Sequence, residues 1–146
     1  MKKQGIACYL NILAAILGIA GVILTVVSST ATTDNALSGL PMLVAAGVIG
    51  ILLVCAAIYL PNRMGNHDPI SAVAVLGAIA LYSYVFGACV SQRVMLIAGL
   101  FSFNAGNTAG WQVFYLCVAA WCCILVGIIA LIVGSFLKSV KEPETV

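Results

Sequence analysis

Charged residues are scarce in this chain. Only 7% of its 146 residues are Asp, Glu, Lys or Arg, whereas a soluble globular domain contains about 25%. The hydrophobic fraction is 64%, and a domain of this length leaves more than about a quarter of its surface in contact with solvent. That solvent has to be lipid. The composition therefore excludes a soluble enzyme, a nucleic-acid-binding protein, a disordered tail and a secreted disulfide scaffold.

The few charged residues divide the chain into four uncharged intervals. These intervals have lengths of 30, 28, 24 and 44 residues and cover residues 4–33, 35–62, 69–92 and 94–137. Each is longer than the roughly 20 residues with which a helix crosses ~30 Å of hydrocarbon. We expect one all-α membrane domain, residues 1–146, built as an antiparallel bundle of four transmembrane helices. The predicted spans are about 6–28, 41–60, 70–90 and 111–137.

Local signals support the ends of these spans. Pro41 and Pro69 stand at helix entrances, where a missing N–H costs nothing, and Asp68 is a suitable N-cap for the third span. The first span could be a signal peptide, but its apolar region exceeds the usual length of about 7–15 residues. A fifth span is not expected, because the apolar run 94–101 is too short to cross and residues 104–110 have turn chemistry.

Basic residues gather on one side of the predicted membrane. With four spans, Arg93 faces one side, and the other side carries Lys2, Lys3, Arg63, Lys138 and Lys141. The positive-inside rule assigns the basic side to the cytoplasm. We therefore expect both termini and the turn 61–68 to be cytoplasmic and residues 29–40 and 91–110 to be extracytoplasmic, in the plasma membrane. The turn is short, so the second and third spans should be antiparallel neighbours.

The spans lack the groups that drive catalysis or ion coupling. None contains Asp, Glu, Lys or Arg, whereas coupled transporters and proton relays keep a charged residue inside the membrane. This composition argues against a small multidrug exporter and against a pore lined by a charged ring. The one histidine, His67, lies in a polar turn without a second ligand. We expect no catalytic residue, no metal and no cofactor.

The six cysteines also lack the spacing of a metal or redox site. No pair has Cys-x-x-Cys spacing, and none lies in a polar loop. We expect small apolar packing residues at Cys8, Cys55, Cys89, Cys117, Cys122 and Cys123. A disulfide between Cys89 and Cys117 stays open, because both lie toward the extracytoplasmic ends of neighbouring spans.

The segment from Val94 to Phe103 is too apolar for a free loop. We expect a short extracytoplasmic lid that lies on the membrane surface or forms a strand against residues 26–33. A simple helical extension of the third span is the alternative. Asp34 and Arg93 are the only charges on that side and form the expected outer charge pair. The candidate partner contacts are Val94, Leu96, Phe101, Phe103 and Trp111.

Pairs of small residues four apart occur in every span. Such pairs let helix backbones approach closely where lipid supplies no hydrophobic drive between helices. They are Ala14 with Gly18, Ala46 with Gly50, Ser83 with Gly87, and Ala119 with Cys123 and Gly127. We expect a tight bundle, with any unmatched pair free for another protein.

These features favour a non-enzymatic membrane protein. The leading hypothesis is a structural or accessory subunit that contacts membrane lipids and associates with itself or with a larger membrane-protein complex. The alternative is a transporter or channel component for a neutral or lipophilic solute, acting as an oligomer or with a polar cavity around Asn11, Tyr82 and Tyr84. A membrane enzyme that uses Asp34 and Arg93 on lipid headgroups would have fewer groups than such chemistry usually needs.

Overall fold

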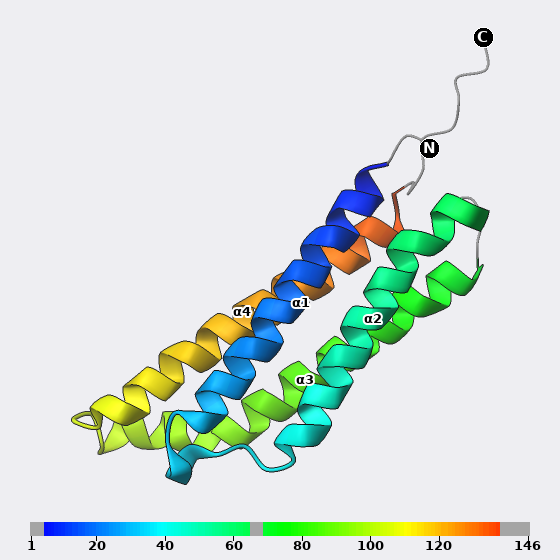
Figure 1. Ribbon diagram of the computed structural model, residues 1–146. Coiled ribbons are helices and arrows are strands. Elements are labelled where there is room, and N and C mark those ends of the chain that lie inside the picture. Colours follow the sequence, from blue (N-terminus) through cyan, green and yellow to red (C-terminus); the bar gives the residue numbers. More distant parts are fainter. Residues whose placement is uncertain (1–4, 65–68, 138–146) are drawn as a thin grey trace.

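The computed structural model describes residues 5–64 and 69–137, which form four long helices and one short 3₁₀ turn (Figure 1). The helices are α1 (Ile6–Thr30), α2 (Leu40–Met64), α3 (Pro69–Ser102) and α4 (Thr108–Ser135), and the 3₁₀ turn η1 (Thr33–Asn35) follows α1. Each long helix is long and apolar enough to cross a membrane. This confirms the all-α expectation and the four candidate spans. Lys2, Lys3, His67, Asp68, Lys138 and Lys141 lie outside the described residues.

The four helices are arranged so that neighbours in sequence are neighbours in space. α1 contacts α2 and α4, and α3 contacts α2 and α4. The expected contact between the second and third spans is therefore confirmed. The start of α1 and the end of α4 lie at one end of the bundle, here called the terminal end (Figure 1). The opposite end carries η1 and the α3–α4 turn and is called the η1 end.

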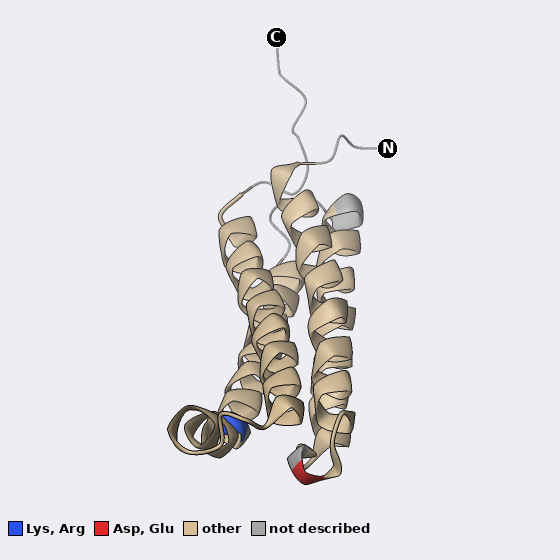
Figure 2. Ribbon diagram, turned by 90° about the vertical axis from the view of Figure 1, so that its left-hand side faces the viewer, with Lys and Arg blue, Asp and Glu red and all other residues tan. Residues whose placement is uncertain are grey.

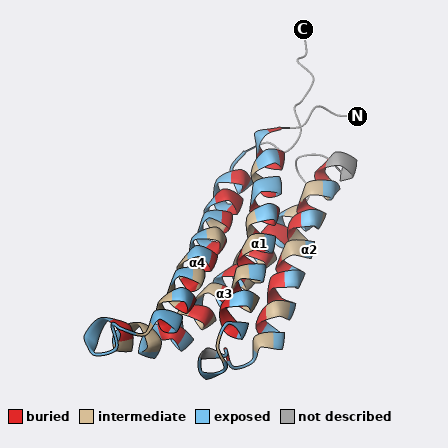
Figure 3. Cartoon of the chain, turned by 60° about the vertical axis from the view of Figure 1, so that its left-hand side comes forward, coloured by how far each residue is buried: buried red, intermediate tan, exposed pale blue. Residues whose placement is uncertain are grey.

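Each helix buries one stripe and exposes the rest of its surface (Figure 3). Only 33% of the most apolar window of each span is buried inside the bundle. Large aliphatic side chains fill the exposed faces, among them Ile16, Leu52, Val73, Leu76 and Ile129. Water would disfavour these side chains at roughly 25 cal/mol per Å², and lipid removes that penalty.

Tyr82 lies at the centre of the bundle and is 2% exposed. Its ring extends from α3 toward glycines of the three other helices. A Cβ at Gly50 of α2 would lie 2.8 Å from the Tyr82 Cε1 atom, and one at Gly18 of α1 would overlap the Tyr82 hydroxyl. At Gly127 of α4 the distance to Cε2 would be 3.7 Å. The Tyr82 hydroxyl donates a 3.4 Å hydrogen bond to the Ala14 carbonyl, so the polar end of the side chain has a partner.

The small-residue pairs of α1 and α2 are buried as predicted, and the pair of α3 is not, because Ser83 and Gly87 are exposed. Of the three small residues predicted in α4, Gly127 is buried, Cys123 is half-buried and Ala119 is exposed. The buried stripe of α4 includes Cys117, Ala120, Ile124, Gly127, Leu131 and Gly134. An exposed glycine or alanine is tolerated in lipid, so spacing alone does not distinguish a packed small pair from an exposed one.

The third helix is longer than the sequence predicted. The expected span ended near residue 90, but α3 continues to Ser102 and includes most of the segment predicted as a lid. The segment is a helical extension of α3, and the described residues contain no strand, so the strand form of the lid is wrong. The expected position on the membrane surface stays a prediction. The helix continues because Val94–Ser102 contains no proline or charge that would end it. Its last turns bend away from the bundle axis and are seen almost end-on in Figure 2.

Two other boundaries differ by a few residues. α2 continues through Pro61 to Met64, past its predicted end at residue 60. α4 begins at Thr108, three residues before the predicted start, because Asn107 caps it: the Gly110 N–H donates to Asn107 Oδ1 at 2.9 Å.

The glycine contacts of Tyr82 predict which glycines tolerate a methyl group. Gly18→Ala should lower the free energy of unfolding by about 1–3 kcal/mol, since the methyl group overpacks a ring that Gly50 already confines. Gly87→Ala is the matched control, because no atom of another helix lies within 4 Å of the point where its new methyl group would stand. That variant should be neutral or more stable by up to about 1 kcal/mol, reflecting helix propensity. Thermal unfolding in detergent measures both, and equal effects would contradict the central position of Tyr82.

Candidate functional site

Buried polar side chains gather at the η1 end of the bundle. Among the described residues, the buried polar or charged side chains are Asn11, Thr25, Ser28, Ser29 and Arg93. All except Asn11 lie where α1 ends and α3 passes it. This cluster is the largest group of buried polar side chains among the described residues.

Arg93 is 3% exposed, and its Nη2 atom donates a 3.1 Å hydrogen bond to the Ser28 carbonyl of α1. That carbonyl is one of the last four of α1, which have no partner inside the helix. A cation at a helix C-terminus also interacts favourably with the helix dipole. Arg93 therefore caps α1, and this contact satisfies one of the N–H groups of the buried guanidinium.

The hydroxyl groups of the cluster are bonded to nearby backbone. Ser28 Oγ donates to the Thr25 carbonyl at 2.9 Å, and Thr25 Oγ1 donates to the Gly21 carbonyl at 2.8 Å. Ser29 Oγ accepts the Leu37 N–H at 2.8 Å and so holds the connection that follows α1. These hydroxyls serve the backbone and local folding.

Gln92, next to Arg93, holds the same connection from α3. Its Oε1 accepts hydrogen bonds from the Ser38 N–H at 2.7 Å and from the Ser38 hydroxyl at 3.1 Å. Its Nε2 donates to the Ser38 carbonyl at 3.3 Å. This role of Gln92 was not predicted from the sequence. The available signal was the adjacent polar pair Gln92-Arg93 within an otherwise apolar run.

The two residues of the expected charge pair lie in different environments. Asp34 is exposed in η1, whereas Arg93 is buried beside α1. The acidic and basic segments of the ribbon both lie at the η1 end (Figure 2). The direct or water-mediated pair stays a prediction, and the contact with Ser28 shows that Arg93 also has a structural task.

All six cysteines are free thiols. Cys8, Cys89 and Cys117 are buried and fit the expected packing role, Cys123 is half-buried, and Cys55 and Cys122 are exposed. The disulfide left open between Cys89 and Cys117 is not formed. Among the residues that the structure describes, no three His, Cys, Asp or Glu side chains come together.

The residues proposed for a polar cavity do not gather. Tyr82 lies in the centre, and Tyr84 is 45% exposed, with its hydroxyl 3.8 Å from the Met42 sulfur. Asn11 lies toward the terminal end, close to Gly134 of α4: a Cβ added at this glycine would lie 3.3 Å from Asn11 Oδ1. That oxygen is buried and has no hydrogen-bond partner among the described residues. Asn11, Tyr82 and Tyr84 therefore lie apart and do not line one polar cavity.

An apolar groove lies on the surface of α2 beside α1. It has a volume of about 640 Å³ and is lined by Val26 of α1 and by Leu40, Pro41, Val44, Ala45, Val48 and Ile49 of α2. No lining side chain carries a polar group, so the groove offers no chemistry for a reaction.

The candidate partner contacts lie around the α3–α4 turn. Phe101 packs edge-on against Trp111, with ring centroids 5.1 Å apart, and Trp111 Nε1 donates to the Ala105 carbonyl at 2.9 Å. Phe114 and Tyr115 complete this aromatic cluster. Val94, Phe101 and Phe103 are exposed, whereas Leu96 and Trp111 are half-buried.

Comparison with protein-family models, curated proteins and solved structures found no match for this chain. The class of the protein therefore follows from the fold. It is an all-helical protein with four helices suited to span a membrane.

The burial of Arg93 predicts unequal effects of removing the two outer charges. Arg93→Ala should lower the free energy of unfolding by about 2 kcal/mol, because it removes a charge-assisted hydrogen bond and uncaps α1. Asp34→Ala, at an exposed position, should change it by no more than about 0.5 kcal/mol. Unfolding of both variants in the same detergent tests this difference. A larger effect of Asp34→Ala would show that the charge pair dominates.

Proposed function

We propose that this chain is a structural or accessory subunit without catalytic residues, which joins a larger membrane-protein complex through its η1 end. The observation that carries the proposal is the exposure of Phe103 and Met95, which are 87% and 83% exposed. Both residues lie past the part of α3 that is needed to span the membrane. Large apolar side chains with such exposure are typical of interaction sites. Leu96 and Trp111, the half-buried candidate contacts, lie at the same end of the bundle.

The filled interior supports an accessory role over transport. Tyr82 occupies the space between α1, α2 and α4 at mid-bundle. A neutral solute would need a continuous path there, and moving this ring would disrupt contacts with three helices. The alternative of a transporter or channel component thus requires a path between copies of the chain, so a single bundle does not favour it.

The proposed location is the plasma membrane, with both termini in the cytoplasm and the η1 end outside. The basic residues flanking the spans support this orientation. It places the exposed Phe103 and Met95 where an extracytoplasmic part of a partner can reach them.

The orientation predicts the labelling of single cysteines in a cysteine-free background. Ser38→Cys and Asn107→Cys should react with a membrane-impermeant maleimide in intact cells, because both lie at the η1 end. Asn66→Cys should react only after the cells are permeabilised. Labelling of Asn66→Cys from outside would reverse the assigned orientation.

The proposed docking surface predicts that one aromatic residue controls assembly. Phe103→Ser should release the chain from its native complex, since truncating a central aromatic contact costs about 2 kcal/mol or more, or about 30-fold in affinity. Native mass spectrometry after mild detergent extraction measures the bound fraction and identifies the partner.

Phe136→Ser is the matched control, because Phe136 is 84% exposed but lies at the end of α4. This variant should keep the complex. If both variants keep it, the η1 end is not the docking surface. A wild-type chain that extracts as a lone monomer would contradict the accessory role itself.

A further inference from the structure

The length of α3 raises the question of where its last turns lie. Its 34 residues correspond to about 51 Å of helix, whereas the hydrocarbon core is ~30 Å thick. A straight helix would carry its last dozen residues into water. Instead the segment after residue 90 turns across the η1 end of the bundle (Figure 1, Figure 2). In this region Ser91 Oγ donates to the Ala88 carbonyl at 3.1 Å.

The exposed face of this segment continues the lipid-facing surface of the span. Exposed residues recur along α3 at intervals of three or four positions, at Val73, Leu76, Ala80, Tyr84, Gly87, Ser91, Val94, Ala98 and Phe101. The first members of this stripe belong to the apolar part of α3 that is suited to span a membrane, where exposed side chains would face lipid. The stripe reaches Phe101 without a charged residue. Lipid, which would contact the first residues of this stripe, is therefore the simplest environment for its last residues as well.

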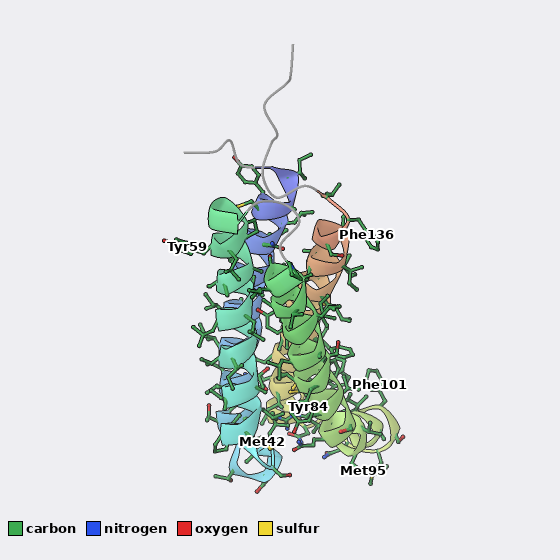
Figure 4. The ribbon with its side chains drawn as sticks, turned by 90° about the vertical axis from the view of Figure 1, so that its right-hand side faces the viewer. Met42, Tyr59, Tyr84, Met95, Phe101 and Phe136 are labelled. Carbon is green, nitrogen blue, oxygen red and sulfur yellow. The ribbon has the colours of Figure 1, made fainter. Side chains whose placement is uncertain are left out.

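We propose that residues 91–102, here called distal α3, lie along the membrane surface at the η1 end with Val94, Ala98 and Phe101 turned toward the lipid. Val94 and Phe101 are seven residues apart and share one face, whereas Met95 is about 120° from Phe101. Figure 4 accordingly shows Met95 and Phe101 on different sides of the helix. One face thus meets the lipid and leaves Met95 free for a partner.

The aromatic cluster supports this placement. Phe101 contacts Trp111 and Phe114, and Tyr115 lies against Trp111. Tyrosine and tryptophan concentrate at the membrane–water interface, where an apolar ring meets lipid and a polar atom meets water. The Trp111 N–H is already bonded to the Ala105 carbonyl, which ties the cluster to the α3–α4 turn.

The lipid chemistry follows from the charges of the segment. The only charged side chain of distal α3 is Arg93, and it is buried against α1. Attraction to anionic headgroups therefore contributes little, and apolar insertion at the boundary between headgroups and acyl chains supplies the contact. Uncharged phosphatidylcholine vesicles should suffice for binding, and raising the salt concentration should not displace the segment.

Spin labelling of the full chain in phosphatidylcholine vesicles tests the proposal. Single cysteines replace Val94, Met95, Ala98 or Phe101 in a cysteine-free background, and each label is tested for collision with oxygen, which dissolves in lipid, and with a water-soluble nickel chelate. Labels at 94, 98 and 101 should favour oxygen and report similar depths. The label at 95 should favour the nickel chelate.

Other outcomes would overturn the proposal. A projecting helix would give depths that change steadily by about 10 Å from residue 94 to 101. Nickel access at residue 101 equal to that of an Asn104→Cys control would place the segment in water. Labels that neither reagent reaches would show that protein, such as a second copy of the chain, covers this face.

A second measurement leaves distal α3 unaltered. In a Trp121→Phe variant, Trp111 is the only tryptophan. Its fluorescence should be quenched more strongly by phosphatidylcholine brominated near the headgroup than by lipid brominated near the end of the acyl chain. Equal or absent quenching would place the aromatic cluster away from the interface and would also overturn the proposal.

Discussion

The ring of Tyr82 lies at the centre of the bundle because three other helices present glycine to it. Lipid supplies no hydrophobic drive between helices, so close packing must hold the bundle together. Gly18, Gly50 and Gly127 let α1, α2 and α4 approach one side chain, and the Ala14 carbonyl accepts its hydroxyl. This contact therefore joins all four helices at the middle of the bundle.

The η1 end depends on a different constraint, which is the need to satisfy polar groups in an apolar setting. Arg93 caps the carbonyl end of α1, while its neighbour Gln92 holds Ser38 in the connection to α2. Two adjacent residues of α3 thus fix two other parts of the chain. These contacts tie the start of distal α3 to α1 and to the connection that follows it, which would hold the proposed docking surface in place.

Much of the fold could be predicted from the sequence, and less of the candidate site. Charge scarcity and four long apolar intervals predicted four helices suited to span a membrane, and the structure has them. The end of the third helix was placed about twelve residues too early, because polar Ser91, Gln92 and Arg93 resembled the start of a loop. The roles of Gln92 and Arg93 required knowledge of which helix passes them, and spacing along one helix does not contain that information.

The sequence by itself determined the medium, the class of fold and the absence of embedded acids, since these depend only on composition and on the length of apolar runs. Tertiary structure decided which small residues are packed. Ser83 and Gly87 have the same spacing as Ala14 and Gly18, yet only the latter pair is buried. The physical reason is that lipid accepts small and large apolar side chains alike, so only contact between helices separates a packing face from a lipid-facing one.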